Sequence, residues 1–176
     1  ELGIAVVPTF PRHPIVMAQQ ALTTQAISGG RLTLGIGLSH QPIIESSYGY
    51  SFDKPIRHMR EYLDALLPLV REGNVAFTGE TVTARIGLDV RGAAPVRVVL
   101  AALGPKMLEL AGGRADGTAT WMTGPATLAQ HVIPTIRAAA AAAGRPAPMV
   151  GAGFPVCVTD DVDGARAAAA QTFAIY

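Results

Sequence analysis

Hydrophobic residues along the chain form short continuous runs separated by stretches with helical spacing. Continuous apolar runs are typical of parallel strands that are covered on both faces. The predicted strands span residues 3–7, 32–36, 96–101, 117–121 and 149–158. Helical segments lie between them, so the chain is predicted to consist of consecutive β/α units joined by right-handed crossovers.

The predicted helices carry start and stop signals at their ends. Pro14 suits the first turn of a helix, and Gly29-Gly30 suits its end. Further helices are expected over residues 55–71, from residue 105 to Gly112-Gly113, over residues 125–143, and from residue 162 to the end of the chain at Tyr176. Asp161 is placed to cap the last of these, which is rich in alanine.

Two segments interrupt the β/α alternation. Residues 37–54 form a long polar stretch, which is typical of a lid or a binding loop. Residues 74–86 alternate around Gly79-Glu80 and predict a small hairpin insertion. No linker divides the chain, so residues 1–176 are predicted to form a single domain.

Composition narrows the classes of protein that the pattern allows. Apolar residues make up 49% of the chain and charged residues 15%, below the roughly 25% usual for soluble domains. No apolar run reaches the ~18 residues of a membrane span, so no membrane partner is expected. The net charge of +1 is scattered, which argues against nucleic acid. The single Cys157 and the histidine spacing predict no disulfide and no metal site, and they fit a cytoplasmic protein.

Periodicity alone leaves two architectures open. Five β/α units suit a complete doubly wound sheet, but Gly35-Ile36-Gly37 lacks the third glycine of the phosphate-binding fingerprint and no helix follows it directly. An eight-stranded β/α barrel needs about 250 residues. Five consecutive units of such a barrel, with strands missing at both ends, would also have this pattern.

Two motifs in the sequence resemble those of a known family. The first is the strand at residues 2–8 followed by Pro11-Arg12-His13-Pro14, and the second is Ser-Gly-Gly-Arg-Leu-Thr-Leu-Gly-Ile-Gly at residues 28–37. Together they resemble the bacterial-luciferase-like oxidoreductase superfamily, and more narrowly its branch that uses the deazaflavin coenzyme F420. Shorter matches continue to about residue 173. The resemblance implies a TIM-type (β/α)8 barrel, with this chain covering about strands 3 to 7.

The resemblance also implies a cofactor site at the carboxyl ends of the strands. It places a bulge with a non-prolyl cis peptide at Ala5-Val6, which backs the ring of the cofactor. The positions that match cofactor contacts of the family are Ala5, Val6, Leu38, Ser39, His40, Ala102, Leu103, Gly104, Thr123 and Gly124. Thr123 and Gly124 would meet the phosphate of the cofactor, because helix N-termini favour anions.

Three functions follow from the resemblance. The first is an oxidoreductase that transfers a hydride between coenzyme F420 and a small organic substrate, with His40 as the catalytic side chain. The second is an FMN-dependent monooxygenase, and the third is a non-catalytic flavin-binding relative. A homodimer is implied. Strands 1, 2 and 8 are absent from the match, so a segment of this kind alone is expected to have open sheet edges and an incomplete site.

Other polar residues have simpler interpretations. Ser39 beside His40 suggests a nucleophile, but the glycine that a nucleophile elbow needs after the serine is missing. His13 is expected to fix a helix entry, while His58 and His131 are expected to be solvated. Trp121 fits either a ligand contact or core packing. In the same way, Glu61 is expected to pair with a helix arginine, and Cys157 to be buried within a strand.

Overall fold

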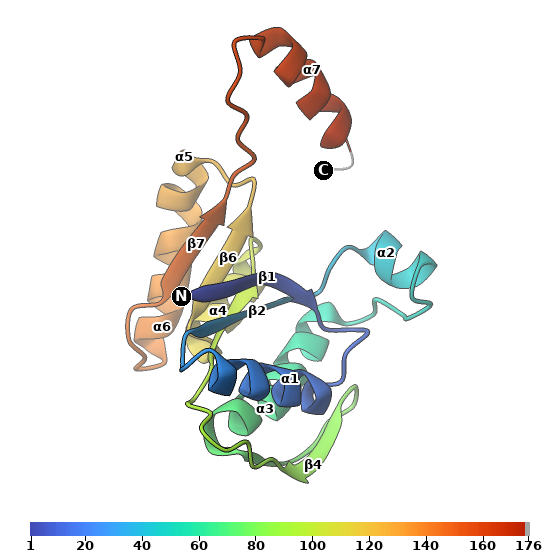
Figure 1. Ribbon diagram of the computed structural model, residues 1–176, viewed down its shortest axis with the longest axis vertical. Coiled ribbons are helices and arrows are strands. Elements are labelled where there is room, and N and C mark those ends of the chain that lie inside the picture. Colours follow the sequence, from blue (N-terminus) through green and yellow to red (C-terminus); the bar gives the residue numbers. More distant parts are fainter. Residues whose placement is uncertain (175–176) are drawn as a thin grey trace.

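A curled parallel sheet of five strands organises the computed structural model, which describes residues 1–174 (Figure 1). Its order is β1-β2-β5-β6-β7, with the strands at Leu2–Pro8, Leu32–Gly37, Arg97–Ala101, Gly117–Trp121 and Met149–Gly153. The strands follow one another across the sheet in chain order. A doubly wound sheet reverses its strand order at a switch point, whereas a β/α barrel does not. The sheet is therefore part of a TIM-type barrel.

Helices cover the outer face of this sheet. They are α1 (Pro14–Ile27), α3 (Pro55–Glu72), α4 (Pro105–Arg114), and a continuous run of α5 (Pro125–Thr127), the π-helical turn η1 (Leu128–Val132) and α6 (Ile133–Ala142). The short α2 (Gln41–Ser46) follows β2. The last helix, α7 (Val162–Thr172), has no buried residue and stands away from the sheet (Figure 1). The helix expected to reach Tyr176 ends at Thr172, and Ile175 and Tyr176 lie outside the described residues.

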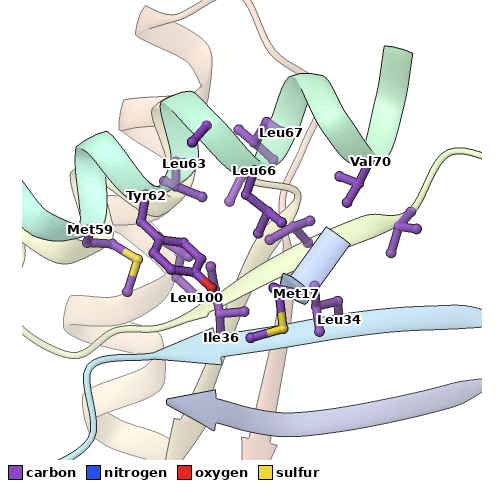
Figure 2. Packing of buried hydrophobic residues seen from close by; sticks show 14 of the residues in the cluster. Met17, Leu34, Ile36, Met59, Tyr62, Leu63, Leu66, Leu67, Val70 and Leu100 are labelled. Carbon is purple, nitrogen blue, oxygen red and sulfur yellow. The ribbon is translucent and has the colours of Figure 1, made fainter. Parts of the chain in front are cut away.

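Large aliphatic side chains fill the space between the sheet and its helices. Figure 2 shows Leu63 and Leu66 of α3 directed toward Ile36 of β2, and all three are fully buried. Each side chain of this size contributes about 1.5–3 kcal/mol when it leaves water. This core holds the outer face of the sheet rigidly, so the strand ends have fixed positions.

The inner face of the same strands is built from much smaller side chains. In a parallel sheet, paired residues point to the same face. The inner positions defined by this pairing begin with Thr33, Arg97 and Met149 at the amino ends of their strands and continue with Gly35, Gly37, Val99, Ala101, Gly117, Ala119, Trp121, Gly151 and Gly153. Ordinary β/α barrels fill this space with bulky branched residues. Here glycine and alanine leave most of it open.

The structure corrects the predicted end of the last strand. β7 ends at Gly153, which pairs with Trp121, the last residue of β6. Beyond that pair no strand within residues 1–174 lies beside the chain, although its apolar pattern continues. Residues 154–158 are therefore not part of the sheet, and Val156 and Val158 are 82% and 97% exposed. Cys157, expected to be buried, is exposed.

The sequence suggested that Gly112 and Gly113 end a helix, but both lie within its last turn. α4 continues to Arg114, and Gly112 faces α6. A Cβ atom at Gly112 would lie 2.3 Å from the carbonyl oxygen of Ile136. This glycine therefore permits the close packing of α4 against α6, a role that a helix-breaking interpretation misses.

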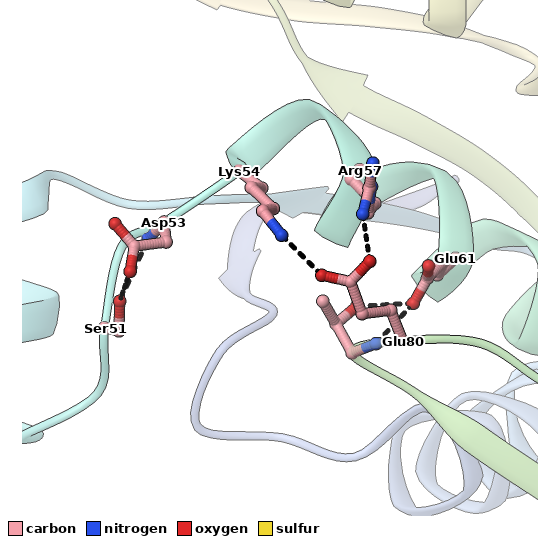
Figure 3. A network of polar contacts seen from close by, with 7 residues as sticks. Ser51, Asp53, Lys54, Arg57, Glu61 and Glu80 are labelled. Carbon is pink, nitrogen blue, oxygen red and sulfur yellow. Dashed lines mark hydrogen bonds and ion pairs between the residues drawn. The ribbon is translucent and has the colours of Figure 1, made fainter.

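A hairpin of β3 (Asn74–Thr78) and β4 (Thr83–Gly87) occupies the place of the expected insertion. Its tip is held to α3 by charged groups (Figure 3). Glu80 pairs with Lys54 at 2.6 Å and with Arg57. Glu61, expected to pair with an arginine of its own helix, instead accepts hydrogen bonds from the backbone and the hydroxyl of Thr81.

Gln25 joins three parts of the outer layer, and its removal tests how much such a buried amide contributes. Its Oε1 accepts from Leu32 N at 2.8 Å, and its Nε2 donates to Pro95 O at 2.9 Å. Gln25→Leu is expected to lower the free energy of unfolding by about 2–4 kcal/mol, because two backbone groups lose their partners. Urea denaturation measures the loss. Gln19→Leu, on the exposed face of the same helix, should change stability by less than about 0.5 kcal/mol.

Candidate active site

A cavity of about 960 Å³ lies against the inner face of the sheet, at the carboxyl ends of its strands. Its walls come from β1, β5, β6 and β7 and from the segment that follows β2. The lining residues are Ala5, Val6, Leu38, Ser39, His40, Ala101, Ala102, Leu103, Met107, Ala119, Thr120, Trp121, Thr123, Gly151, Ala152 and Gly153. Ligand sites of β/α barrels lie at this end of the strands. A smaller cavity of about 220 Å³ lies near the ends of α1 and α3, away from this end of the sheet.

The first wall is the bulge in β1. The peptide bond between Ala5 and Val6 is cis, as predicted, and the pairing of β1 with β2 is irregular between Ile4 and Val7. The Val6 side chain lies over β2, where a Cβ at Gly37 would be 2.9 Å from Val6 Cγ2. The glycines of β2 therefore make room for the bulge, and Val6 faces the cavity.

The second wall follows β2 and carries two of the polar side chains of the cavity. Leu38 and Ser39 are half-buried and His40 is exposed. Ser39 has a φ of 63°, in the left-handed region that residues other than glycine seldom adopt. His40 is the N-cap of α2, and its carbonyl accepts from the amides of Ile43 and Ile44 at 3.0 Å. The helix start thus fixes where the His40 backbone lies.

The loop after β5 supplies Ala102 and Leu103, and its carbonyls are held from behind. The Thr118 hydroxyl lies 3.4 Å from Ala102 O. His131 Nε2 donates to Leu103 O at 2.8 Å. His131, expected to be solvated, is half-buried, because the π-helical turn η1 brings its ring to this loop. Such π-turns often occur at functional sites.

The fourth wall is the end of β6. Trp121 is 50% exposed, so it is not a core residue. Thr123 is buried and its hydroxyl donates to Trp121 O at 3.2 Å. Between them Met122 has a φ of 54°, another left-handed residue beside the cavity. Strained residues of this kind gather at ligand sites more than elsewhere.

Eight of the ten positions that the resemblance assigned to the cofactor line this one cavity. The other two, Gly104 and Gly124, are the N-caps of α4 and α5 and adjoin lining residues. The sequence reasoning missed the contribution of β7, whose Gly151 and Gly153 carried a usable signal as small residues at alternate positions. Within residues 1–174, no three His, Cys, Asp or Glu side chains gather in a way that could hold a metal ion.

His58 lies outside the cavity and is buried, although the sequence suggested a solvated residue. Its Nε2 lies 3.1 Å from the hydroxyl of Thr9, and its ring stacks on Phe10 with centroids 4.1 Å apart. Burial lowers the pKa of His58 below its ordinary value, and the nearby Glu61 carboxylate acts in the opposite direction. The cluster anchors the chain directly after β1.

The lowered pKa of His58 predicts a pH dependence of stability. Below the ordinary pKa of 6.5 the unfolded chain protonates this residue more readily than the native chain does. The contribution of His58 is therefore complete above about pH 6.5 and declines as the pH falls toward its lower native pKa. We expect the free energy of unfolding to fall between about pH 7 and 5, and to fall less in His58→Gln. Equal slopes in the two proteins, measured by urea denaturation, would contradict this expectation.

The fold and the cavity together define a β/α-barrel protein with a ligand site at the carboxyl ends of its strands. A family model described as luciferase-like monooxygenase matches residues 1–176. The chain belongs to this luciferase-like family, as its motifs indicated. In the part of the chain that the structure describes, no helix has both the length and the apolar character needed to cross a bilayer.

Several similar proteins are named for coenzyme F420. A putative coenzyme F420-dependent oxidoreductase of Mycobacterium tuberculosis is 34% identical over 66% of this chain and 38% of its own length. The 5,10-methylenetetrahydromethanopterin reductase of Methanolobus tindarius is 28% identical over 99% of this chain and 53% of its own. The solved F420-dependent tetrahydromethanopterin reductase of Methanopyrus kandleri has the same fold, with a TM-score of 0.76 and 24% identity over 93% of this chain and 52% of its own. The chain thus spans about half the length of the curated relatives it matches over nearly its whole extent.

Proposed function

We propose that the protein is an oxidoreductase that transfers a hydride between coenzyme F420 and a small organic substrate. The observation that carries this proposal is the convergence of Val6, Leu38, Leu103 and five other implied cofactor positions on one cavity. A relative and a solved structure that are named for F420 support the choice of cofactor. The proposal covers the whole protein, of which this chain would form one side of the site.

The shape and chemistry of the cavity fit a deazaflavin ring. Ala101, Ala119 and Gly151 present a wall with almost no side-chain relief, against which a flat ring packs without a clash. Val6 closes one side of that wall. Ser39 and His40 offer polar groups at the rim, where the polar edge of a ring needs hydrogen bonds. A volume of about 960 Å³ falls in the range of cofactor and ligand cavities.

In this proposal the bound cofactor supplies the hydride chemistry at its C5 atom. The protein would orient the cofactor and the substrate, exclude water from the site and supply a proton. The apolar walls exclude water, which strengthens every polar contact inside. His40 would hold or release the proton that accompanies hydride transfer, at a nitrogen of its imidazole ring. The backbone amides of Thr123 and Gly124 would meet the phosphate at the start of the continuous run of α5, η1 and α6. Pro125, the first residue of that run, has no N–H and would donate nothing.

The competing functions share this wall and differ in the ligand. An FMN-dependent monooxygenase would bind FMN in the same place, and a non-catalytic relative would bind a flavin without turnover. We also propose that the enzyme is a cytoplasmic homodimer, as the resemblance implies. Sedimentation of the purified protein at micromolar concentration checks the dimer.

Binding measurements test the cofactor. The purified protein is titrated with coenzyme F420 and, separately, with FMN, and the heat of binding is recorded. We expect F420 to bind with at least tenfold the affinity of FMN; FMN binding without F420 binding would overturn the proposal in favour of the monooxygenase. Ala119→Leu places a larger side chain on the inner wall and should weaken F420 binding at least ~10-fold through steric exclusion. Ala168→Leu, on exposed α7, serves as the matched control and should bind normally.

A further inference from the structure

Trp121 occupies an unusual place for the largest apolar side chain in the sequence. It is the last residue of β6, it faces the cavity, and half of its surface is exposed. Its ring lies over Gly153 of β7, where an added Cβ would be 2.9 Å from Cε3 and 3.3 Å from Cζ3. The glycine therefore supports one side of the indole and leaves another toward the cavity. The ring is held in position without being buried.

The surroundings of Trp121 on the cavity wall are apolar. Leu103 is 50% exposed at the same cavity, and the side chain of Met107 also contributes to the wall. The nearby hydroxyls of Thr120 and Thr123 are directed to backbone carbonyls, those of Gly151 and Trp121. Among the described residues, sixteen line the cavity, and none of them is Asp, Glu, Lys or Arg.

We propose that Trp121 is a specificity-determining residue that selects a substrate with an uncharged, apolar alkyl or ring group. This inference rests on the proposed oxidoreductase function and deepens it by naming the substrate class. An apolar group loses water favourably against the exposed indole, with Leu103 and Met107 beside it. A phosphate or carboxylate in the same place would lose its hydration without gaining an opposite charge from this wall. The substrate class is therefore that of small uncharged molecules with an apolar alkyl or ring group, for which cyclohexanone serves as a probe.

Trp121 is the sole tryptophan among these 176 residues, so its indole fluorescence can report on the proposal. The difference in emission between the parent protein and Trp121→Phe isolates its signal. The purified protein, first without and then with saturating coenzyme F420, is titrated with cyclohexanone and with cyclohexanecarboxylate. The two probes share a ring and differ in charge. We expect cyclohexanone to change the Trp121 emission and to bind at least ~10-fold more tightly than the carboxylate. Equal or tighter binding of the carboxylate, or of glucose 6-phosphate in a parallel titration, overturns the inference.

Two variants separate a substrate contact from a cofactor contact. Calorimetry should show that Trp121→Leu weakens cyclohexanone binding about 10-fold, that Trp121→Phe retains most of the affinity, and that both bind F420 within about twofold of the parent protein. An equal loss of F420 affinity in Trp121→Leu would make Trp121 a cofactor contact and overturn the inference. Absence of F420 binding in the parent protein would instead overturn the proposed function, and the titration without cofactor would still decide between neutral and charged ligands.

Discussion

Gly35→Ala is expected to lower the free energy of unfolding by about 3 kcal/mol or more, a large effect for a single methyl group. A Cβ at Gly35 would lie 2.0 Å from the carbonyl oxygen of Ile4 and 3.1 Å from Val6 Cγ1. The first of these contacts is with backbone, which cannot rotate away as a flexible side chain does. β1 and β2 would have to separate at the bulge, with loss of parallel pairing and of the wall that Val6 provides.

Gly3→Ala is the matched control for that substitution. Gly3 lies in β1, pairs with Thr33, and has no atom within 4 Å of the position its Cβ would take. Alanine there should change stability by less than about 0.5 kcal/mol. Urea denaturation of both variants measures the difference. If the two curves coincide, the approach of β1 to Gly35 is looser than the structure has it.

Asp116→Ala is expected to reduce the free energy of unfolding by about 2–4 kcal/mol. Charge-assisted hydrogen bonds contribute about 1.5–3 kcal/mol each, and the partial exposure of these side chains to solvent keeps the total below the sum of the individual bonds. The carboxylate, which is partly buried, binds Arg71 at 3.1 Å and Arg145 at 3.2 Å. It also accepts from the amide of Val98 at 2.9 Å. One side chain thus joins the end of α3, the start of β5 and the segment before β7.

Asp116→Asn divides this effect into its parts. Asparagine keeps an acceptor for the Val98 amide but removes the charge, so its loss should be about half that of alanine. Asp163→Ala, on an exposed helix, removes a carboxylate whose pairing with Arg166 spans 3.6 Å and should cost less than about 0.5 kcal/mol. Chemical denaturation measures all three. A loss at Asp116 as small as that at Asp163 would show that the three elements are held by packing alone.

The strands were predictable because their physical cause is local. A parallel strand covered on both faces must be continuously apolar, and four of the five strands fall within two residues of the predicted ends. The fifth prediction ran five residues too far, to Val158. Apolar residues continue there, but the neighbouring strand has already ended at Trp121. Pairing between strands limits a strand's length, and that information is not contained in the strand's own sequence.

The candidate site divides in the same way. The cis peptide at Ala5-Val6 and the cavity-lining positions after β2 and β5 were anticipated because the motifs there are specific. The environments of His58 and His131 were not, because a histidine on a helix has the same sequence pattern whether it faces water or a partner. Contacts with Thr9 and with Leu103 decide the matter. These partners are 49 and 28 residues away in the chain.

The contrast between the two faces of the sheet has a consequence for how this protein can change over generations. On the outer face, at positions such as Ile36 and Leu100, most replacements remove atoms and leave holes in a close-packed core. On the inner face, at Ala119 and Gly151, almost every replacement adds atoms. Drift on the outer face therefore erodes folding, whereas drift on the inner face narrows the range of molecules that enter. Substitutions in the same five strands thus have two separate effects: those on the outer face change stability, and those on the inner face change which ligands bind.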